Sequence, residues 1–474
     1  MPFSAEQKRA QEHVSATARK FLDFVEQRPH LLDESTFEGL FRGAYEVVPT
    51  PSGIELGEDY LQPWPILIDE TRRRRFERAG VAIARLVRGI PERFFANDPK
   101  AVAEFYGLEN ELSAALLLSS PSFIHETLGR GDFMETESGL KCIEVNFGNL
   151  GGWQHSAYAS LFTSHPDIKD FTEAHGLELV NRNSIRALLR HVVRDSLRRL
   201  PPGSKQLNVM VVASDDGNTS LGSHPLAHYE REFRQVLRWM GGGRITGRLD
   251  VVKLGQLEFH DGWLEVDGIR YQSVIEQNAG EPSTRIFRSA KAGKVCCYCG
   301  LIGTVTGDKR NLALLSEHQS SPRFSFDEQR CIARYVPWTR HLIDASVERG
   351  GRHHPMRQLL LDRQRDMVIK AGLGFAGYQV VVGRFVDSAQ WQKRLDEALE
   401  VGGWIAQEYL ETLPQTYQQG KRGAGAYDVI WGLYVFGDSY GGEFFRMAPR
   451  AQLATVNIAQ GGRIGVVFKA LKAS

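Results

Sequence analysis

One segment, residues 130–146, constrains the fold of this chain more than any other. It reads Arg-Gly-Asp-Phe-Met-Glu-Thr-Glu-Ser-Gly-Leu-Lys-Cys-Ile-Glu-Val-Asn. Residues 137–139 can form a three-residue hairpin loop, with Gly139 at the position that requires a positive φ. The segment therefore predicts two antiparallel strands that fold back around Ser138.

The predicted pairing gathers four polar side chains on one face of the hairpin. Asp132 falls opposite Glu144, and Arg130 falls opposite Asn146, because strand residues alternate between faces. Oxygen ligands of this kind suit Mg²⁺ that is also bound to phosphate, and an arginine beside them suits an anionic substrate. An ordinary surface hairpin with cross-strand charge pairs explains the same spacing equally well. The other face of the hairpin would point into a core, through Ile143 and Val145.

Composition narrows the class of protein. The 474 residues suffice for two or three domains, and 58 basic against 57 acidic residues give a net charge of +1. This balance lacks the basic excess of a nucleic-acid binder, and the run at residues 72–75 (four arginines) is expected to be a solvated helix face. The polar N-terminus, the absence of a long apolar run and five cysteines favour a cytoplasmic protein without membrane contact. The cysteines at 296, 297 and 299 are expected in a buried strand.

The pattern along the chain divides it into four regions. Residues 1–115 are expected to be mostly helical, and residues 116–204 hold the hairpin, a glycine-rich continuation and a basic amphipathic helix. Residues 205–300 alternate strand, helix and strand, which predicts a small doubly wound α/β domain. Residues 301–474 mix helices and strands around two glycine-bearing loops. The overall class is α+β.

Two lysines stand where a phosphate could bind. Lys370 ends a predicted strand and precedes a glycine-rich turn with Gly374 and Gly377, after which a second strand follows. Glycines allow close approach of the backbone to phosphates, and the lysine supplies a charge. Lys309 opens a helix, where the helix dipole disfavours a cation unless an anion compensates. A plain glycine turn and an exposed lysine are the structural alternatives.

Two later segments add further candidates. Residues 404–410 predict a strand that leads into a linker, where backbone groups around Gln407, Glu408 and Tyr409 could bind an adenine edge. A core strand explains the same pattern. Arg446 ends another predicted strand pair and could stabilise a developing oxyanion or an acyl phosphate. A structural ion pair is its alternative role.

Taken together, these motifs resemble the ATP-grasp superfamily over residues 116–474, in particular the circularly permuted branch of glutathionylspermidine synthetase-like carboxylate–amine ligases. In that branch the hairpin precedes the two ATP-binding lysines. Here Ala371 replaces the usual proline after the lid lysine, and about sixty residues, rather than fewer, separate the two lysines. The resemblance implies that residues 116–204 form the metal-binding half of the core and residues 205–300 a domain like the one that precedes it in the family. Residues 301–474 would then carry the ATP-binding lid and the rest of the core.

The resemblance implies an ADP-forming ligase that joins a carboxylate to an amine, or to a thiol, through an acyl phosphate. ATP would be bound by Lys309, Lys370, the lid glycines and the 407–409 linker, and Mg²⁺ by Asp132, Glu144 and Asn146. Arg130 and Arg446 would act in catalysis on small-molecule or peptide substrates. A phosphotransferase and a non-catalytic nucleotide-binding or scaffold protein are alternatives. Substrate identity and oligomeric state are not encoded in any motif.

Overall fold

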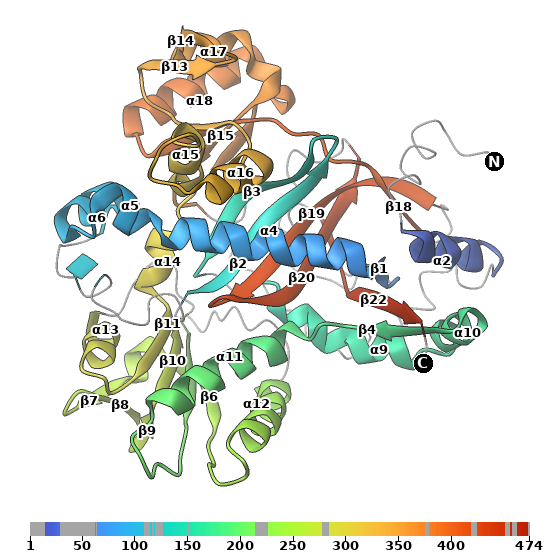
Figure 1. Ribbon diagram of the computed structural model, residues 1–474, viewed down its shortest axis with the longest axis vertical. Helices are drawn as coiled ribbons and strands as arrows, with labels where there is room; N and C mark the ends of the chain where they lie inside the picture. Colours follow the sequence, from blue (N-terminus) through green and yellow to red (C-terminus); the bar gives the residue numbers. More distant parts are fainter. Residues whose placement is uncertain are drawn as a thin grey trace.

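The computed structural model describes residues 15–28, 62, 64–108, 114–115, 118, 127–148, 151–213, 226–276, 284–374, 379–418, 424–450, 456 and 462–472. A six-stranded antiparallel sheet lies at the centre of the molecule (Figure 1), with strands in the order β21-β20-β19-β2-β3 and β18 added to β19. It joins segments far apart in sequence: β2 (Leu128–Thr136), β3 (Gly139–Phe147), β18 (Gln415–Gln418), β19 (Ala424–Phe436), β20 (Ser439–Pro449) and β21 (Arg463–Gly465).

One face of this sheet is covered by helix α4 (Glu70–Arg88), which crosses it in Figure 1. The helix buries Phe76 and Ile83 against Trp431 and Leu433 of β19, the alternate residues of a strand with one apolar face. The arginine run in α4 is not a simple solvated face, as the sequence suggested. Arg73 and Arg74 pair with acidic residues of α4 itself, but Arg72 and Arg75 both pair with the buried Glu135 of β2. That prediction is wrong for half of the run.

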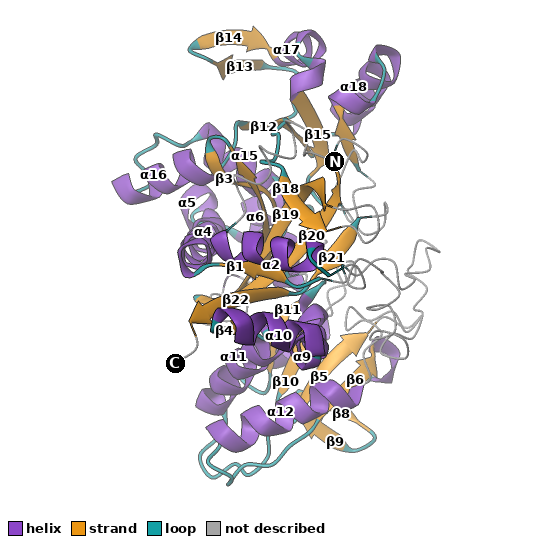
Figure 2. Cartoon of the chain, turned by 90° about the vertical axis from the view of Figure 1, so that its right-hand side faces the viewer, coloured by secondary structure: helices purple, strands orange, loops and turns teal. Residues whose placement is uncertain are grey.

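The predicted α/β domain is present as a separate layer (Figure 2). Its parallel sheet has the order β11-β10-β5-β6, formed by β5 (Val209–Ala213), β6 (Leu249–Lys253), β10 (Ser273–Glu276) and β11 (Cys296–Cys299). Val211 faces a core shared with two helices, whereas Val212 faces the core on the opposite side. The elements around the sheet are α11 (Ser184–Arg199), α12 (Leu226–Met240), α13 (Thr284–Lys291), α14 (Leu301–Thr306), η4 (Leu254–Gln256), β7 (Glu258–His260), β8 (Trp263–Val266) and β9 (Ile269–Tyr271). The cysteine strand is buried, as predicted.

A third layer holds the glycine-rich hairpin and stands at one end of the long axis (Figure 1). Its sheet has the order β12-β17-β15-β16. The layer comprises β12 (Thr339–His341), β13 (Ser346–Arg349), β14 (Arg352–Pro355), β15 (Met367–Ala371), β16 (Val380–Val382), β17 (Trp404–Glu408), α15 (Arg310–Glu317), α16 (Phe326–Tyr335), α17 (Met356–Asp362), α18 (Ser388–Val401), η5 (Gln364–Asp366) and η6 (Gly383–Phe385). We refer to it as the lid sheet and its helices.

A small sheet, β1-β22-β4, pairs a strand of the N-terminal region with the last described strand. Its strands are β1 (Ile66–Ile68), β4 (Leu177–Val180) and β22 (Val467–Lys472), and nearby helices are α2 (Ala16–Glu26), η3 (Trp153–Tyr158), α9 (Ala159–Ser164) and α10 (Pro166–His175). Helices α5 (Ile90–Phe95) and α6 (Pro99–Tyr106) follow α4 on the opposite side of the molecule (Figure 1). The described part of residues 1–115 is thus mostly helical, with β1 as its one strand. None of the described helices has the length and apolar character needed to span a membrane. The four domain boundaries stay predictions.

Candidate functional site

The hairpin β2–β3 has the predicted register. Arg130 pairs with Asn146 and Asp132 pairs with Glu144, so the four polar residues lie in two adjacent rows across the sheet. The turn is one residue shorter than predicted, because Gly139 pairs with Thr136 and only two residues make the reversal. Gly139 has a φ of +103°, as its place in the turn requires.

A β-bulge in this hairpin corrects the prediction for Ile143. Asp132 pairs with Glu144 but Phe133 pairs with Cys142, which leaves Ile143 without a direct partner on β2. Ile143 consequently packs on a small cluster with Ile430, apart from the core that contains Val145. The bulge also leaves the Ile143 carbonyl to accept a hydrogen bond from Lys370 Nζ at 2.9 Å.

Asp132 is the centre of a buried ion cluster. Its Oδ1 lies 2.9 Å from Arg130 Nε, and its Oδ2 lies 2.7 Å from Arg446 Nη2. Asn146 Nδ2 donates a hydrogen bond to the same Oδ2 at 3.0 Å. Burial alone would raise the pKa of Asp132, but the Arg130 and Arg446 guanidiniums outweigh that effect and hold it below its usual range.

Lys309 connects the hairpin to the lid sheet. Its Nζ lies 3.3 Å from Glu144 Oε1 and donates a hydrogen bond to the Gly374 carbonyl at 2.8 Å. Its backbone N–H donates to the Gly372 carbonyl at 2.9 Å, directly before α15 begins at Arg310. The predicted helix start is therefore correct, and the lysine is held at both its backbone and its ammonium group.

Lys370 approaches the same hairpin from β15. Its Nζ bonds the Ile143 carbonyl and, at 2.7 Å, Gln407 Oε1 of the neighbouring strand β17. Gln407 is held in turn by its Nε2, which donates to Thr339 Oγ1 at 3.0 Å. Burial lowers the pKa of Lys370 to about 8, since the attraction of Glu144 only partly offsets the loss of hydration. The two lysines thus converge on β3 from separate elements.

The 407–409 linker is arranged differently from the other candidates. The Glu408 N–H donates to the Trp338 carbonyl at 3.0 Å, and the Tyr409 N–H donates to the Asp366 carbonyl at 2.8 Å. Both amides are therefore engaged within the lid sheet. Glu408 Oε1 also accepts a hydrogen bond from the Trp338 N–H at 2.9 Å. An adenine-binding role for this linker stays a prediction.

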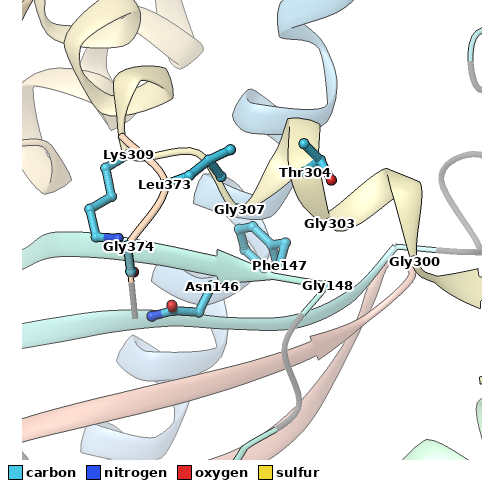
Figure 3. A pocket seen from close by; sticks show the side chains of 10 residues that line it. All are labelled: Asn146, Phe147, Gly148, Gly300, Gly303, Thr304, Gly307, Lys309, Leu373 and Gly374. Carbon is cyan, nitrogen blue, oxygen red and sulfur yellow. Dashed lines mark hydrogen bonds between the residues drawn. The ribbon is translucent and has the colours of Figure 1, made fainter. Parts of the chain in front are cut away.

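A pocket lies where the three layers meet (Figure 3). Asn146 and Lys309 lie on one side of it, Gly374 closes the lid end, and Thr304 lies on α14. The remaining walls come from four glycines and two apolar residues: Gly148, Gly300, Gly303, Gly307, Phe147 and Leu373. Glycine walls of this kind let a ligand approach the main chain closely. Gly377, the other predicted lid glycine, lies outside the described residues.

Three residues that carry the site were not singled out from the sequence. Phe444 lies under both arginines, with its ring centroid 5.1 Å from each guanidinium carbon. Gly432 makes room for Arg130, because a Cβ there would stand 2.8 Å from Arg130 Cδ. Gly372 bonds Lys309 to the lid sheet. Gly432 lies one strand away from Asp132, and Phe444 lies two strands away. Finding them from the sequence would have required the register of β19 and β20, which local patterns do not give.

The donor set suits Mg²⁺ in part. Glu144 offers a partly exposed carboxylate, and Asn146 retains its amide oxygen because its nitrogen faces Asp132. Asp132 has both oxygens engaged by cations or an amide, so it would have to release one of them to bind a metal. Among the described residues, no cluster of three or more His, Cys, Asp and Glu side chains could hold a metal ion. Metal binding by all three predicted residues stays a prediction.

Comparison with known proteins supports the fold. The chain is similar to a glutathione synthetase-like effector from Globodera pallida in its apo form, with a TM-score of 0.56 and 11% identity, covering 94% of this chain and 98% of that one. A provisionally assigned gamma-glutamylcysteine synthetase from Methylobacillus flagellatus KT gives a TM-score of 0.38 at 12% identity, covering 81% of this chain and 86% of that one. A TM-score this low does not establish a common fold. No protein-family model matches the chain, and no curated protein does. The chain therefore has a mixed α and β fold of glutathione synthetase-like architecture.

Proposed function

We propose that this protein is an ATP-dependent ligase of the circularly permuted ATP-grasp type, which joins a carboxylate to an amine and releases ADP and phosphate. The fold likeness supports the architecture. The chemistry rests on the site, because a fold alone does not determine an activity.

The observation that carries the proposal is the excess of buried positive charge around the hairpin β2–β3. Four cations meet two carboxylates there, which leaves a formal surplus of two positive charges (four minus two) among Arg130, Asp132, Glu144, Lys309, Lys370 and Arg446. Surplus buried charge is costly unless a ligand of opposite sign compensates it. A triphosphate together with a carboxylate has the required sign of charge.

The residues divide between the two ends of the site. Lys309 and Lys370 would bind the phosphates of ATP between β3 and the lid sheet, and the bond from Lys309 to Gly374 would link that contact to the lid. Arg130 and Arg446 would orient the substrate carboxylate at the other end. A carboxylate oxygen then attacks the γ-phosphorus, the bond to the β-phosphate oxygen breaks, and ADP leaves.

The second half-reaction uses the same arginines. The amine attacks the acyl phosphate carbon, its proton passes to water, and the carbon–oxygen bond to the phosphoryl group breaks. Arg130 and Arg446 would stabilise the oxyanion and the departing phosphate, a contribution of roughly 3 kcal/mol for such donors. Glu144 and Asn146, with Asp132 if it exchanges an arginine, would hold Mg²⁺, which would supply charge compensation for the phosphates.

The proposal is tested by thermal shift and product analysis. ATP with Mg²⁺ should raise the melting temperature of the wild type, and Lys370→Met should weaken that rise, whereas Lys393→Met on the exposed face of α18 should not. Carboxylate and amine panels should then yield ADP and an amide. A phosphorylated product without amide would indicate a phosphotransferase. No rise with ATP and no ADP would refute a catalytic role and favour a scaffold.

A further inference from the structure

Phe444 occupies an unusual place in the anion-binding end of the site. It pairs with Gly432 of β19, and Gly432 pairs with Asp132 of β2, so the three form one row across the sheet. Because Gly432 has no side chain, the Arg130 stem can pass over it toward the ring. Arg446 lies two residues beyond Phe444 on the same face of β20.

The ring of Phe444 contacts both guanidiniums in the same way. The guanidinium carbons of Arg130 and Arg446 each lie 5.1 Å from its centroid, within the range of cation–π attraction. Phe444 is only 3% exposed, so little water competes with this attraction. Gly152 is packed against the ring, since a Cβ on Gly152 would stand 2.6 Å from it, and His155 lies 4.6 Å away between centroids. The ring is therefore fixed by its own neighbours.

Arg446 has an unused donor at this place. Its Nη2 lies 2.7 Å from Asp132 Oδ2, but its buried Nε makes no hydrogen bond within the described residues. Arg446 itself is 7% exposed. A buried guanidinium with an unused N–H points to a ligand, because an unmet donor in a dry site costs free energy. An oxyanion would accept that hydrogen bond.

We infer that Phe444 is the positioning residue for this anion-binding end: its ring holds the guanidiniums of Arg130 and Arg446 in the orientation that binds one carboxylate or phosphoryl group. The identity of the anion rests on the proposed function. The positioning role itself rests on the contacts of the ring. Phe444 touches no reacting atom and acts only through the two arginines.

The experiment replaces Phe444 with phenylalanines of increasing fluorination, up to pentafluorophenylalanine. Fluorine withdraws charge from the ring face and weakens the cation–π attraction while the shape changes little. Phe445 provides the matched control, since it is buried in the same strand but faces Trp431 and Tyr417 on the other side of the sheet. The readouts are melting temperature, the NMR signals of the arginine Nε–H groups during titration with inorganic phosphate, and steady-state kinetics for ADP release.

We expect the phosphate affinity reported by the Arg130 and Arg446 signals to fall progressively, by about tenfold at full fluorination. The same series at position 445 should leave it unchanged, and the KM for the carboxylate substrate should rise at position 444 while the KM for ATP stays constant. Unchanged phosphate affinity across the series at position 444, or no response of either arginine to phosphate in the wild type, would overturn the inference. A fluorine-dependent response without any ADP release would retain it and refute the proposed ligase.

Discussion

The two halves of the site treat buried charge in opposite ways. On the central sheet, Asp132 is paired with two guanidiniums, which lower its pKa despite its burial. On the lid sheet, Lys370 is equally enclosed, but its ammonium group hydrogen-bonds two neutral oxygens and its pKa falls to about 8. In the first half both cations contact a carboxylate directly, whereas in the second half Lys370 contacts none among the described residues and holds a charge that an anionic ligand would stabilise. Binding of an anionic ligand should therefore change the charge environment of Lys370 more than that of Asp132.

The largest effect is expected when the ion cluster around Asp132 is broken. Asp132→Asn leaves two buried guanidiniums without their common carboxylate, which should lower the free energy of unfolding by about 3–5 kcal/mol. Asp396→Asn, which breaks the exposed pair with Arg357, should cost less than about 1 kcal/mol. Denaturant unfolding measures both. Equal effects of the two substitutions would contradict the cluster as a stabilising unit.

The same carboxyl group predicts how stability depends on acid. Because the pKa of Asp132 is lower in the folded state, its contribution is complete above its unfolded value and is lost as the pH falls through the folded value. Asp132→Asn should therefore have a shallower loss of stability in acid than the wild type. Parallel acid profiles for the two proteins would contradict this assignment.

In the lid half, the buried group that controls the pH dependence of stability is a base, Lys370, rather than an acid. The folded pKa of Lys370 is about 8 against an ordinary 10.5, so the unfolded chain binds more protons between these values and stability should rise with pH through that window. The amplitude is about 3 kcal/mol. Lys370→Met should remove the rise and be more stable than the wild type below pH 8, with Lys393→Met as the control. If the stability of the wild type does not change from pH 8 to 10.5, the lowered pKa of Lys370 is refuted.

ATP binding should change the protonation of Lys370. A polyanion favours the charged form of Lys370, so ATP binding above pH 8 should take up protons and ATP affinity should decline as the pH rises. Calorimetry in buffers of different ionisation enthalpy measures the proton uptake. An uptake that persists in Lys370→Met would assign it to another group.

A smaller effect is expected at the junction between the halves. A Cβ on Gly372 would stand 2.8 Å from Arg310 Nε, Asp308 Oδ1 and the Gly403 carbonyl, so Gly372→Ala should cost about 1–3 kcal/mol and move the strand end that bonds Lys309. Gly89→Ala is the control, since there the nearest atoms, at 3.2 Å, belong to the flexible end of Arg93. Chemical denaturation and ATP titration of both variants test the junction. A stable Gly372→Ala with normal ATP affinity would show that the junction tolerates displacement.

The contrast also explains what the sequence could and could not predict. Pairing between Asp132 and Glu144 follows from local alternation and a turn, so the register was accessible. The bulge at Ile143 was not, because alternation alone gives no sign of an extra residue, and it decides which carbonyl Lys370 reaches. The contacts of Phe444 and Gly372 were hidden for another reason. They depend on pairing between segments more than sixty residues apart, which local patterns do not determine.

The smallest effect on ATP affinity is expected from the side chain of Tyr409, in the linker that follows β17. Tyr409 stacks under Arg384, 3.8 Å from its guanidinium carbon, so Tyr409→Leu should change ATP affinity by no more than about threefold. Gln407→Leu is the matched change, because it removes the acceptor that holds the Lys370 ammonium and should weaken ATP binding further. Isothermal titration compares the two. A larger loss of ATP affinity in Tyr409→Leu than in Gln407→Leu would place the nucleotide against the tyrosine ring. The linker, rather than Lys370, would then be the main nucleotide contact of the lid half.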